Sequence, residues 1–444
     1  MKTHLLCAGL LFGLIHTASA QPIITSQTFP VHGFERITAN PDRTISLNLT
    51  GVVTTTFLPY YDLYTLDAST NLVDWSPLGV LERTNNSSNA LSYLDFDGTN
   101  FEKHFYRTHT NALITPFPKP TGPYPVGAVS RLMTDPSPHS FMVTFWYPAQ
   151  AMAGVLPETY VESNATVHTY LNPRDPSIVA QFVSHALPGL PVATNQSSYP
   201  VVLYSTSGTT RRQNTDKALE LASHGYVVVA MEYVTGIAFC VNTKSCFQPT
   251  LDAQTKVLQF VADELNRLNL TDALFAGRLN LERLGVFGFS NGSTMAAEFG
   301  RIDSRCKAVV LLDVGSILEA APGLTQFGLQ KPFLSMNSSM EPRPMVPPGY
   351  GPWLAASLAL FTNAITDALW LQIQNASHQS FQDRGSLISD HTLTNNPTLV
   401  SREPSRTIRA CTVSFFNKYL KGQDDHLLDN PAAVYTNIIN FQRK

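Results

Sequence analysis

From Leu284 to Ser293 the sequence reads LGVFGFSNGS, a short apolar run that ends in the pentapeptide Gly-x-Ser-x-Gly. The residues that follow, 294–300, have the composition of a helix. A strand that turns at once into a helix through a serine is typical of a nucleophile elbow, which holds the hydroxyl clear of the sheet. Gly288 and Gly292 then have a steric reason, because side chains there would collide with the neighbouring strand and helix. Ser290 is therefore the candidate nucleophile, the alternative being a glycine-rich turn without chemistry.

The chain around this elbow alternates between strand and helix patterns. Amphipathic stretches predict helices at 216–224, with Gly225 as the C-cap, and at 250–269. This alternation indicates an α/β fold with a mostly parallel sheet and helices on both faces, and the hairpin turns that an antiparallel α+β layout needs are missing between the strands. Short apolar runs predict these strands at residues 140–147, 200–204, 226–233, 284–289, 308–312, 332–336 and 369–373.

A serine hydroxyl needs a base within hydrogen-bond reach and a carboxylate that orients the base. Asp313 directly ends the strand after the elbow helix, and His378 follows the strand at 369–373, so both emerge where parallel strands end. Their order after the serine, acid and then histidine, is the one expected after such an elbow. The sequence predicts Ser290, Asp313 and His378 as a catalytic triad. The alternatives are Glu341, Asp367 and Asp383 for the acid, and His391 and His426 for the base.

The oxyanion of an acyl-transfer intermediate needs two aimed backbone N–H groups. The elbow geometry supplies the N–H of Asn291. For the second donor we predict Thr209, in the loop after the strand at 200–204, because Gly208 lets the turn bend toward the site. The alternative for this loop is an ordinary Ser/Thr-rich turn that caps a helix.

An apolar pocket beside such a nucleophile suits an acyl or aryl ester. Phe289, Met336 and Trp353 are the predicted substrate-binding residues, although each of them can instead pack in the core. Pro347, Pro348, Tyr350, Phe361 and Trp370 lie in segments that supply further apolar surface.

The length of 444 residues predicts one large domain and a smaller one. Residues 1–20 carry a basic residue, an apolar core and an A-x-A-type site, which predicts a signal peptide and an exported protein, extracellular or periplasmic. Short alternating runs in residues 21–111 predict a small all-β domain, in which Trp75 is expected to pack in the core. Prolines favour an extended linker at 112–124, which leaves 125–444 as the catalytic domain.

The charge and the spacing of the histidines and cysteines limit the kinds of partner and cofactor that we expect. A net charge of -3 and a charged fraction of 14% make nucleic acid an unsuitable partner. No His/Cys cluster has metal-ligand spacing, and we expect neither metal nor cofactor. After export, Cys240 and Cys246 are expected to form a disulfide, and Cys306 and Cys411 would pair by default, the alternative being four buried thiols.

The segment 175–190 could form an amphipathic helix that meets lipid or a polymer surface, or a packed surface helix.

Several of these motifs together resemble the platelet-activating factor acetylhydrolase family of secreted α/β-hydrolases. They are residues 120–127, the strand at 143–148, the elbow, Leu312-Asp313, residues 331–338 and Ser377-His378-Gln379-Ser380-Phe381, and the resemblance spans about residues 118–422. The family's fold and its serine, aspartate and histidine triad are thereby implied for Ser290, Asp313 and His378. In that family the acid follows the strand after the elbow, which favours Asp313 over Glu341.

The resemblance implies a calcium-independent serine esterase that acts on short or oxidised acyl chains of phospholipids. The chain departs from the family pattern at Ser207-Gly208, where the family has His-Gly, at Ser293, where it has glycine, and in its additional N-terminal module. Cutinase-like and polyester- or aryl-ester-cleaving hydrolases share the same chemistry and are the alternative. An alternative of another class is a binding protein built on a dead hydrolase scaffold.

Overall fold

The computed structural model describes two compact units, one ending at Pro118 and one beginning at Lys119. The residues it describes are 33–41, 44–50, 61–84, 90–95, 105–109, 117–137, 139–160, 182–207, 210–232, 244–314, 321–339, 353–383 and 403–444. The predicted signal peptide lies outside the described residues.

The second unit is built on one large sheet, whose described strands follow the order β16-β15-β14-β13-β12-β10-β11-β8-β7-β9. The six strands from β15 to β11 are parallel, and β16, β8 and β7 pair antiparallel at the two sides. The parallel strands are β10 (Tyr199–Ser205), β11 (Val227–Met231), β12 (Leu279–Phe289), β13 (Cys306–Leu312), β14 (Phe333–Ser338) and β15 (Ala368–Ile373). The others are β7 (Val126–Thr134), β8 (Ser140–Pro148), β9 (Ala186–Pro188) and β16 (Ile438–Arg443).

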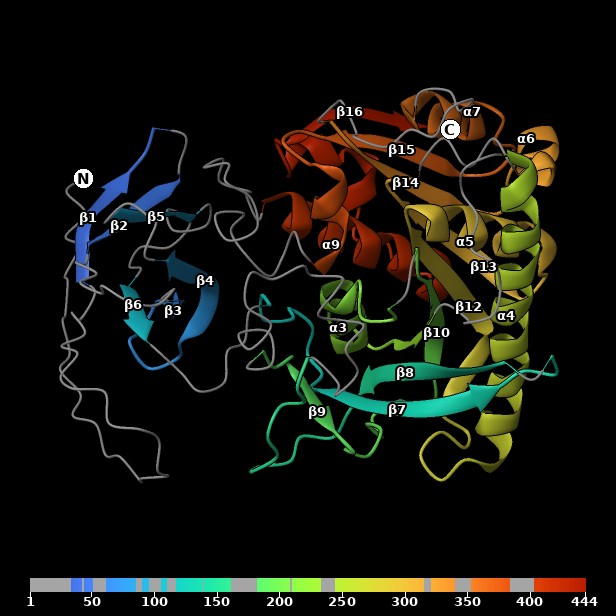
Figure 1. The fold of residues 1–444 in the computed structure, drawn as a ribbon, viewed down its shortest axis with the longest axis horizontal. Coiled ribbons are helices and arrows are strands. Elements are labelled where there is room, and N and C mark those ends of the chain that lie inside the picture. Colours follow the sequence, from blue (N-terminus) through green and yellow to red (C-terminus); the bar gives the residue numbers. More distant parts are fainter. Residues whose placement is uncertain are drawn as a thin grey trace. The chain divides into compact units, whose positions relative to one another are not determined.

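Helices cover both faces of this sheet (Figure 1), because its parallel strands are apolar on both sides. One buried cluster joins alternate strand residues to α4 (Lys244–Thr271) and α5 (Asn291–Ile302). The other joins the intervening strand residues to α3 (Thr215–Ser223) and α9 (Glu403–Phe416). The remaining helical segments are α6 (Pro322–Phe327), α7 (Trp353–Thr362), a π-helical turn at Asn417–Lys421, and 3₁₀ turns at His378–Phe381, Leu427–Asp429 and Pro431–Ala433.

The described strands of the first unit form two three-stranded antiparallel sheets, as expected of a small all-β module. One contains β1 (Gly33–Ala39), β2 (Ile45–Thr50) and β5 (Ala90–Asp95), and the other contains β3 (Tyr61–Ser69), β4 (Ser76–Thr84) and β6 (Phe105–His109).

A side-chain-bonded turn joins β3 to β4. The carbonyl oxygen of the Asn71 side chain accepts the N–H groups of Val73 and Asp74 at 2.9 and 2.8 Å. Trp75 is only partly buried, and the Arg107 guanidinium lies 4.2 Å from its ring centroid. The expectation that Trp75 is a core tryptophan is therefore wrong: it makes a cation–π contact at the end of the turn.

Most of the strands and helices predicted for the second unit are present, and the differences lie mainly in the outer strands of its sheet. The sequence does not predict the strands β7 and β16. The segment 182–190 forms a bridge and the short strand β9 instead of the end of a helix, and residues 175–181 lie outside the described residues. Part of the proline-rich connector packs on the second unit, since the N–H groups of Gly122 and Tyr124 donate to Ser223 at the end of α3.

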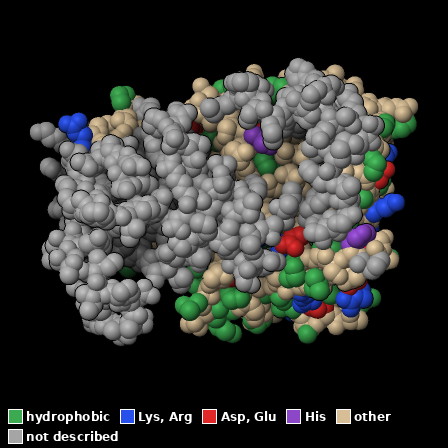
Figure 2. Space-filling view, viewed as in Figure 1, with side chains coloured by type: hydrophobic (Ala, Val, Ile, Leu, Met, Phe, Trp, Pro, Cys, Tyr) green, Lys and Arg blue, Asp and Glu red, His purple; other side chains and the backbone are tan. Residues whose placement is uncertain are grey.

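Within the described part of the chain, no helix combines the length and the apolar character that crossing a membrane requires. Charged side chains of both signs lie scattered over the described surface of the second unit on the face shown in Figure 2.

Candidate active site

Ser290 occupies the turn between β12 and α5, as the sequence predicts. Its backbone angles are φ 55° and ψ -122°, a conformation that a non-glycine residue rarely adopts. The two glycines make this turn sterically accessible. A Cβ at Gly288 would lie 2.1 Å from the carbonyl oxygen of Gly292, and one at Gly292 would lie 2.1 Å from that of Ser205, at the end of β10. The elbow therefore packs backbone to backbone against the strand next to it.

Ser293 fixes the elbow helix to the ends of two strands. Its hydroxyl donates to the carbonyl oxygen of Gly288 at 2.6 Å and accepts the N–H of Leu312 at 3.1 Å. The N–H of Ser290 donates to the carbonyl oxygen of Leu312 at 2.9 Å. The serine that departs from the family's glycine is thus a buried link between the nucleophile turn and the strand that precedes Asp313.

Asp313 follows β13 in a left-handed conformation with φ 51°. Its N–H donates to the carbonyl oxygen of Met336 at 2.8 Å, and its Oδ1 accepts the N–H of Ser338 at 2.9 Å. The residue is fully buried. The neighbouring strand β14 therefore fixes both the backbone and one carboxylate oxygen, and the other oxygen faces a partner from another element.

That partner is His378, the first residue of the 3₁₀ turn after β15. Asp313 Oδ2 lies 2.6 Å from His378 Nδ1, and His378 Nε2 lies 3.0 Å from Ser290 Oγ. The imidazole also packs on the Phe289 ring, with 4.6 Å between the ring centroids. The three residues form a continuous chain of hydrogen bonds from a buried carboxylate to the hydroxyl of Ser290, the arrangement that activates a serine for attack on a carbonyl carbon.

The alternative acids and bases lie elsewhere or outside the described residues. Glu341 and His391 belong to segments that the structure does not describe. Asp367 accepts a hydrogen bond from Tyr419 at 2.8 Å, and His426 lies exposed near the C-terminus. The fifth alternative, Asp383, is buried in a separate network.

Asp383 joins three parts of the second unit five residues after His378. Its Oδ1 accepts the N–H of Asp216 at 3.1 Å, and its Oδ2 lies 3.0 Å from the hydroxyl of Tyr160, which itself donates to the carbonyl oxygen of Arg212 at 3.1 Å. Burial and the neighbouring carboxylate of Asp216 raise the pKa of Asp383 well above its ordinary value. A protonated Asp383 donates to the tyrosine oxygen, which satisfies all of these groups at once.

The two predicted oxyanion donors have different outcomes. Asn291 is the first residue of α5, where helix geometry leaves the backbone N–H without an intrahelical acceptor. The N-terminus of α5 also favours negative charge at this position. Thr209 lies outside the described residues, directly after Ser207 and Gly208.

The two predicted substrate-binding residues whose side chains are described, Phe289 and Met336, are both buried. Phe289 is 2% exposed and packs against His378, and Met336 is 0% exposed and lies in the core beside the sheet. Residues of a covered parallel strand are buried on either face, and the role of these two residues in substrate binding stays a prediction. Trp353 begins α7, and its side chain is not among those described.

The predicted pairing of Cys306 with Cys411 is wrong, since both thiols are free and buried. Cys306 packs with α4 and α5 on one face of the sheet, whereas Cys411 packs in the cluster of α3 and α9 on the other. The sheet between them prevents a bond. Burial raises the pKa of each thiol to about 12, so neither is reactive. The other predicted pair, Cys240 and Cys246, lies outside the described side chains.

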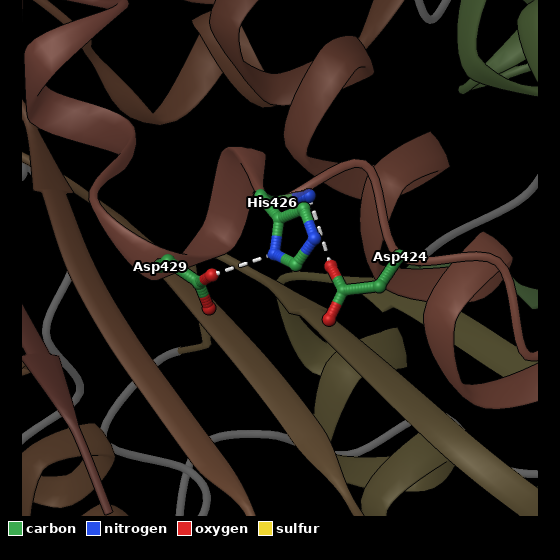
Figure 3. Close-up of side chains that lie close together, drawn as sticks. All are labelled: Asp424, His426 and Asp429. Carbon is green, nitrogen blue, oxygen red and sulfur yellow. Dashed lines mark hydrogen bonds and ion pairs between the residues drawn. The ribbon is translucent and has the colours of Figure 1, made fainter.

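One group of metal-ligating side chains occurs among the described residues, Asp424, His426 and Asp429 (Figure 3). His426 Nδ1 lies 2.9 Å from an oxygen of Asp429. Lys418 and Arg443 each lie 2.6 Å from one of the two carboxylates. These cations already neutralise the exposed carboxylates, so the group is explained as a surface ion-pair network.

A cavity of about 340 Å³ opens at the other edge of the sheet, beside Pro200 and Arg283, which lie at the amino ends of β10 and β12. Lys421 lines it and donates to the carbonyl oxygen of His224 at 2.6 Å, just beyond the end of α3. This cavity is separate from Ser290, which lies at the carboxyl end of β12.

Comparisons with known proteins agree with this architecture. Residues 111–257 match the family described as platelet-activating factor acetylhydrolase, isoform II. The fold is similar to that of a ferulic acid esterase from Streptomyces cinnamoneus, with a TM-score of 0.58 and 22% identity over 73% of this chain and 98% of that one. No curated protein matches the sequence. The predicted resemblance and the α/β-hydrolase fold are confirmed.

Proposed function

We propose that this chain, an α/β-hydrolase that resembles platelet-activating factor acetylhydrolase, is a serine esterase that works through an acyl-serine intermediate. The observation that carries the proposal is the unbroken hydrogen-bond chain from Asp313 through His378 to Ser290, with distances of 2.6 and 3.0 Å. Three residues far apart in the sequence meet at the carboxyl ends of three parallel strands, where this fold binds its ligands.

The geometry gives each residue a role. His378 Nε2 takes the proton of the Ser290 hydroxyl as the oxygen attacks the ester carbon, and the Asp313 carboxylate stabilises the imidazolium that forms. The N–H of Asn291 and the N-terminus of α5 stabilise the negative charge on the carbonyl oxygen. His378 then protonates the leaving alcohol, and water repeats the sequence on the acyl-serine.

For the substrate we propose short-chain or oxidised-acyl lipid esters, as the family resemblance implies. Aryl esters are the second candidate, because the fold is similar to that of a protein named for ferulic acid esterase activity. We further propose that residues 1–20 direct export and that the mature protein meets its ester at a lipid or polymer surface. Rates on a panel from short-chain phospholipids to feruloyl and polyester substrates distinguish these classes.

Replacement of the nucleophile tests the reaction itself. Ser290→Ala is expected to abolish turnover of a short p-nitrophenyl ester, while the circular dichroism spectrum and the unfolding midpoint stay near those of the wild type. Turnover retained by this variant would contradict the acyl-serine mechanism. If the wild-type protein hydrolyses none of the esters in the panel, the alternative of a binding protein on a dead scaffold is favoured.

A further inference from the structure

Gln213 is a buried amide between the two segments that frame the nucleophile. It follows β10 by eight residues and precedes Asn214, the N-cap of α3. Its exposed fraction is 3%. A buried primary amide has two donors and two acceptor sites that must find partners, so its surroundings show what it holds in place.

The carbonyl end of this amide receives the segment that leaves β10. Gln213 Oε1 lies 3.3 Å from the backbone nitrogen of Ser207 and 3.1 Å from its hydroxyl. The hydroxyls of Thr206 and Tyr204 lie 3.1 and 3.3 Å from the same oxygen. Four groups that can donate surround one oxygen, which accepts about two strong hydrogen bonds at a time, and the Thr206 hydroxyl also lies 2.9 Å from the carbonyl oxygen of Thr210. The oxygen is therefore the centre on which the start of this segment is fixed.

The same segment touches the elbow directly. Ser205 and Thr206 approach Gly292 so closely that a Cβ on the glycine would lie 2.1 Å from the oxygen of Ser205 and 2.8 Å from that of Thr206. A shift of the segment is thus a shift of the backbone against which the turn carrying Ser290 packs.

The amino end of the amide reaches the segment that carries His378. Gln213 Nε2 donates to Gln382 Oε1 at 3.1 Å, and the backbone N–H of Asp383 donates to the carbonyl oxygen of Gln213 at 2.8 Å. Gln382 is the C-cap of the 3₁₀ turn that begins at His378. The backbone carbonyl and the Nε2 of Gln213 therefore hold the 3₁₀ turn that begins at His378, whereas its Oε1 holds the segment beside the elbow.

We propose that Gln213 is a positioning residue of the esterase, whose amide ties Ser207 to Gln382 and thereby fixes His378 relative to Ser290. This inference rests on the proposed function. Gln213 touches none of the reacting atoms, so it acts through the geometry of the Ser290–His378 pair. Proton transfer between these groups is sensitive to displacements of about 1 Å, which can cost on the order of 100-fold in rate.

Gln213→Met keeps the length of the side chain and removes both of its polar ends. We expect kcat for a short p-nitrophenyl ester to fall about 10- to 100-fold, with KM changed by less than about threefold.

Gln382→Met breaks the link from its other end and leaves the acceptor for Ser207 intact. If the link matters, the double variant Gln213→Met/Gln382→Met loses no more than Gln213→Met alone, because both changes remove one interaction. Asn269→Leu is the matched control. Its amide also holds backbone, accepting the N–H of Leu279 at 2.9 Å and donating to the Leu279 carbonyl at 3.0 Å, but at the amino end of β12. This control is expected to lower stability and to leave kcat unchanged.

Titration with a fluorophosphonate counts the reactive serines in each preparation, so that kcat is expressed per competent site. A wild-type protein that stays unlabelled would overturn the proposed function, and this assignment with it. A labelled wild type together with a Gln213→Met variant of unchanged kcat would overturn only the role of Gln213. If Gln213→Met fails to fold, an unchanged kcat in Gln382→Met would overturn it equally.

Discussion

Replacing Asp313 with asparagine tests how the buried acid acts, because the structure fixes which way the new amide must face. Oδ1 of Asp313 accepts the N–H of Ser338 at 2.9 Å, and this position must remain an oxygen in the variant. The NH₂ group then takes the place of Oδ2, which lies 2.6 Å from His378 Nδ1. Facing a donor, Nδ1 must accept, so the proton of the neutral imidazole moves to Nε2.

In that tautomer Nε2 donates and can no longer take the proton of Ser290. The variant therefore loses activity for two reasons: His378 no longer acts as a base, and the negative charge that stabilises its imidazolium form is gone. A wrong tautomer of this kind costs about 10⁴-fold in kcat, which corresponds to about 5.4 kcal/mol in the activation barrier. Asparagine has almost the shape of aspartate, and we therefore expect the fold to be retained.

The assay is the steady-state hydrolysis of a short p-nitrophenyl ester, measured beside two controls. Asp303→Asn changes another buried carboxylate, which pairs with Arg305 at 2.6 Å at the end of α5, and is expected to keep the wild-type rate. Glu341→Gln changes the alternative acid and is expected to have little effect. An Asp313→Asn variant within tenfold of the wild type, or a large loss in Glu341→Gln, would refute the assignment of the acid.

Three further changes probe the support of the site. Ser293→Ala removes a buried hydroxyl that bonds two strand ends, and should lower the free energy of unfolding by about 1–3 kcal/mol in urea titrations; an unchanged value would contradict its role. Gly292→Ala places a Cβ 2.1 Å from the oxygen of Ser205, so little folded, active protein should be recovered, and normal yield and activity would show that the contact is not tight. Burial and Asp216 raise the pKa of Asp383 from 3.8 to about 8, so its contribution to stability is complete below pH 4 and is lost as the pH rises toward 8. The stability of Asp383→Asn relative to the wild type should therefore increase from pH 5 to pH 8, and a constant difference would contradict the raised pKa.

Local rules were sufficient to predict the elbow. Gly288 is required by a contact within the turn, with the carbonyl oxygen of Gly292, and the strand and helix on either side have clear patterns, whereas Gly292 is required by the distant Ser205. Asp313 and His378 could be found because each directly follows an apolar strand, and the carboxyl ends of parallel strands meet at one edge. The left-handed backbone of Asp313 and its bond from Ser338 left no signal in the sequence.

Some predictions are wrong because the sequence does not show on which face of the sheet a residue lies. Cys306 and Cys411 looked like the remaining pair, but the sheet separates them. Phe289 and Met336 are predicted to line the pocket, and both are buried because strands covered on both faces bury apolar residues on either side.

Gln213 was missed for a related reason. An amide is neither titratable nor nucleophilic, and its partners Ser207 and Gln382 come together only in the folded chain. Sequence patterns identify the reacting groups, whereas the residues that position them are defined by tertiary contacts.

Fluorophosphonate labelling followed by peptide mass mapping tests the central claim most directly, because the reagent forms a stable bond only with an activated serine. The hydrogen-bond chain from Asp313 through His378 predicts one adduct per chain, located on Ser290, and no adduct in Ser290→Ala. A folded wild-type protein that remains unlabelled, or an adduct on a different serine, would contradict the account.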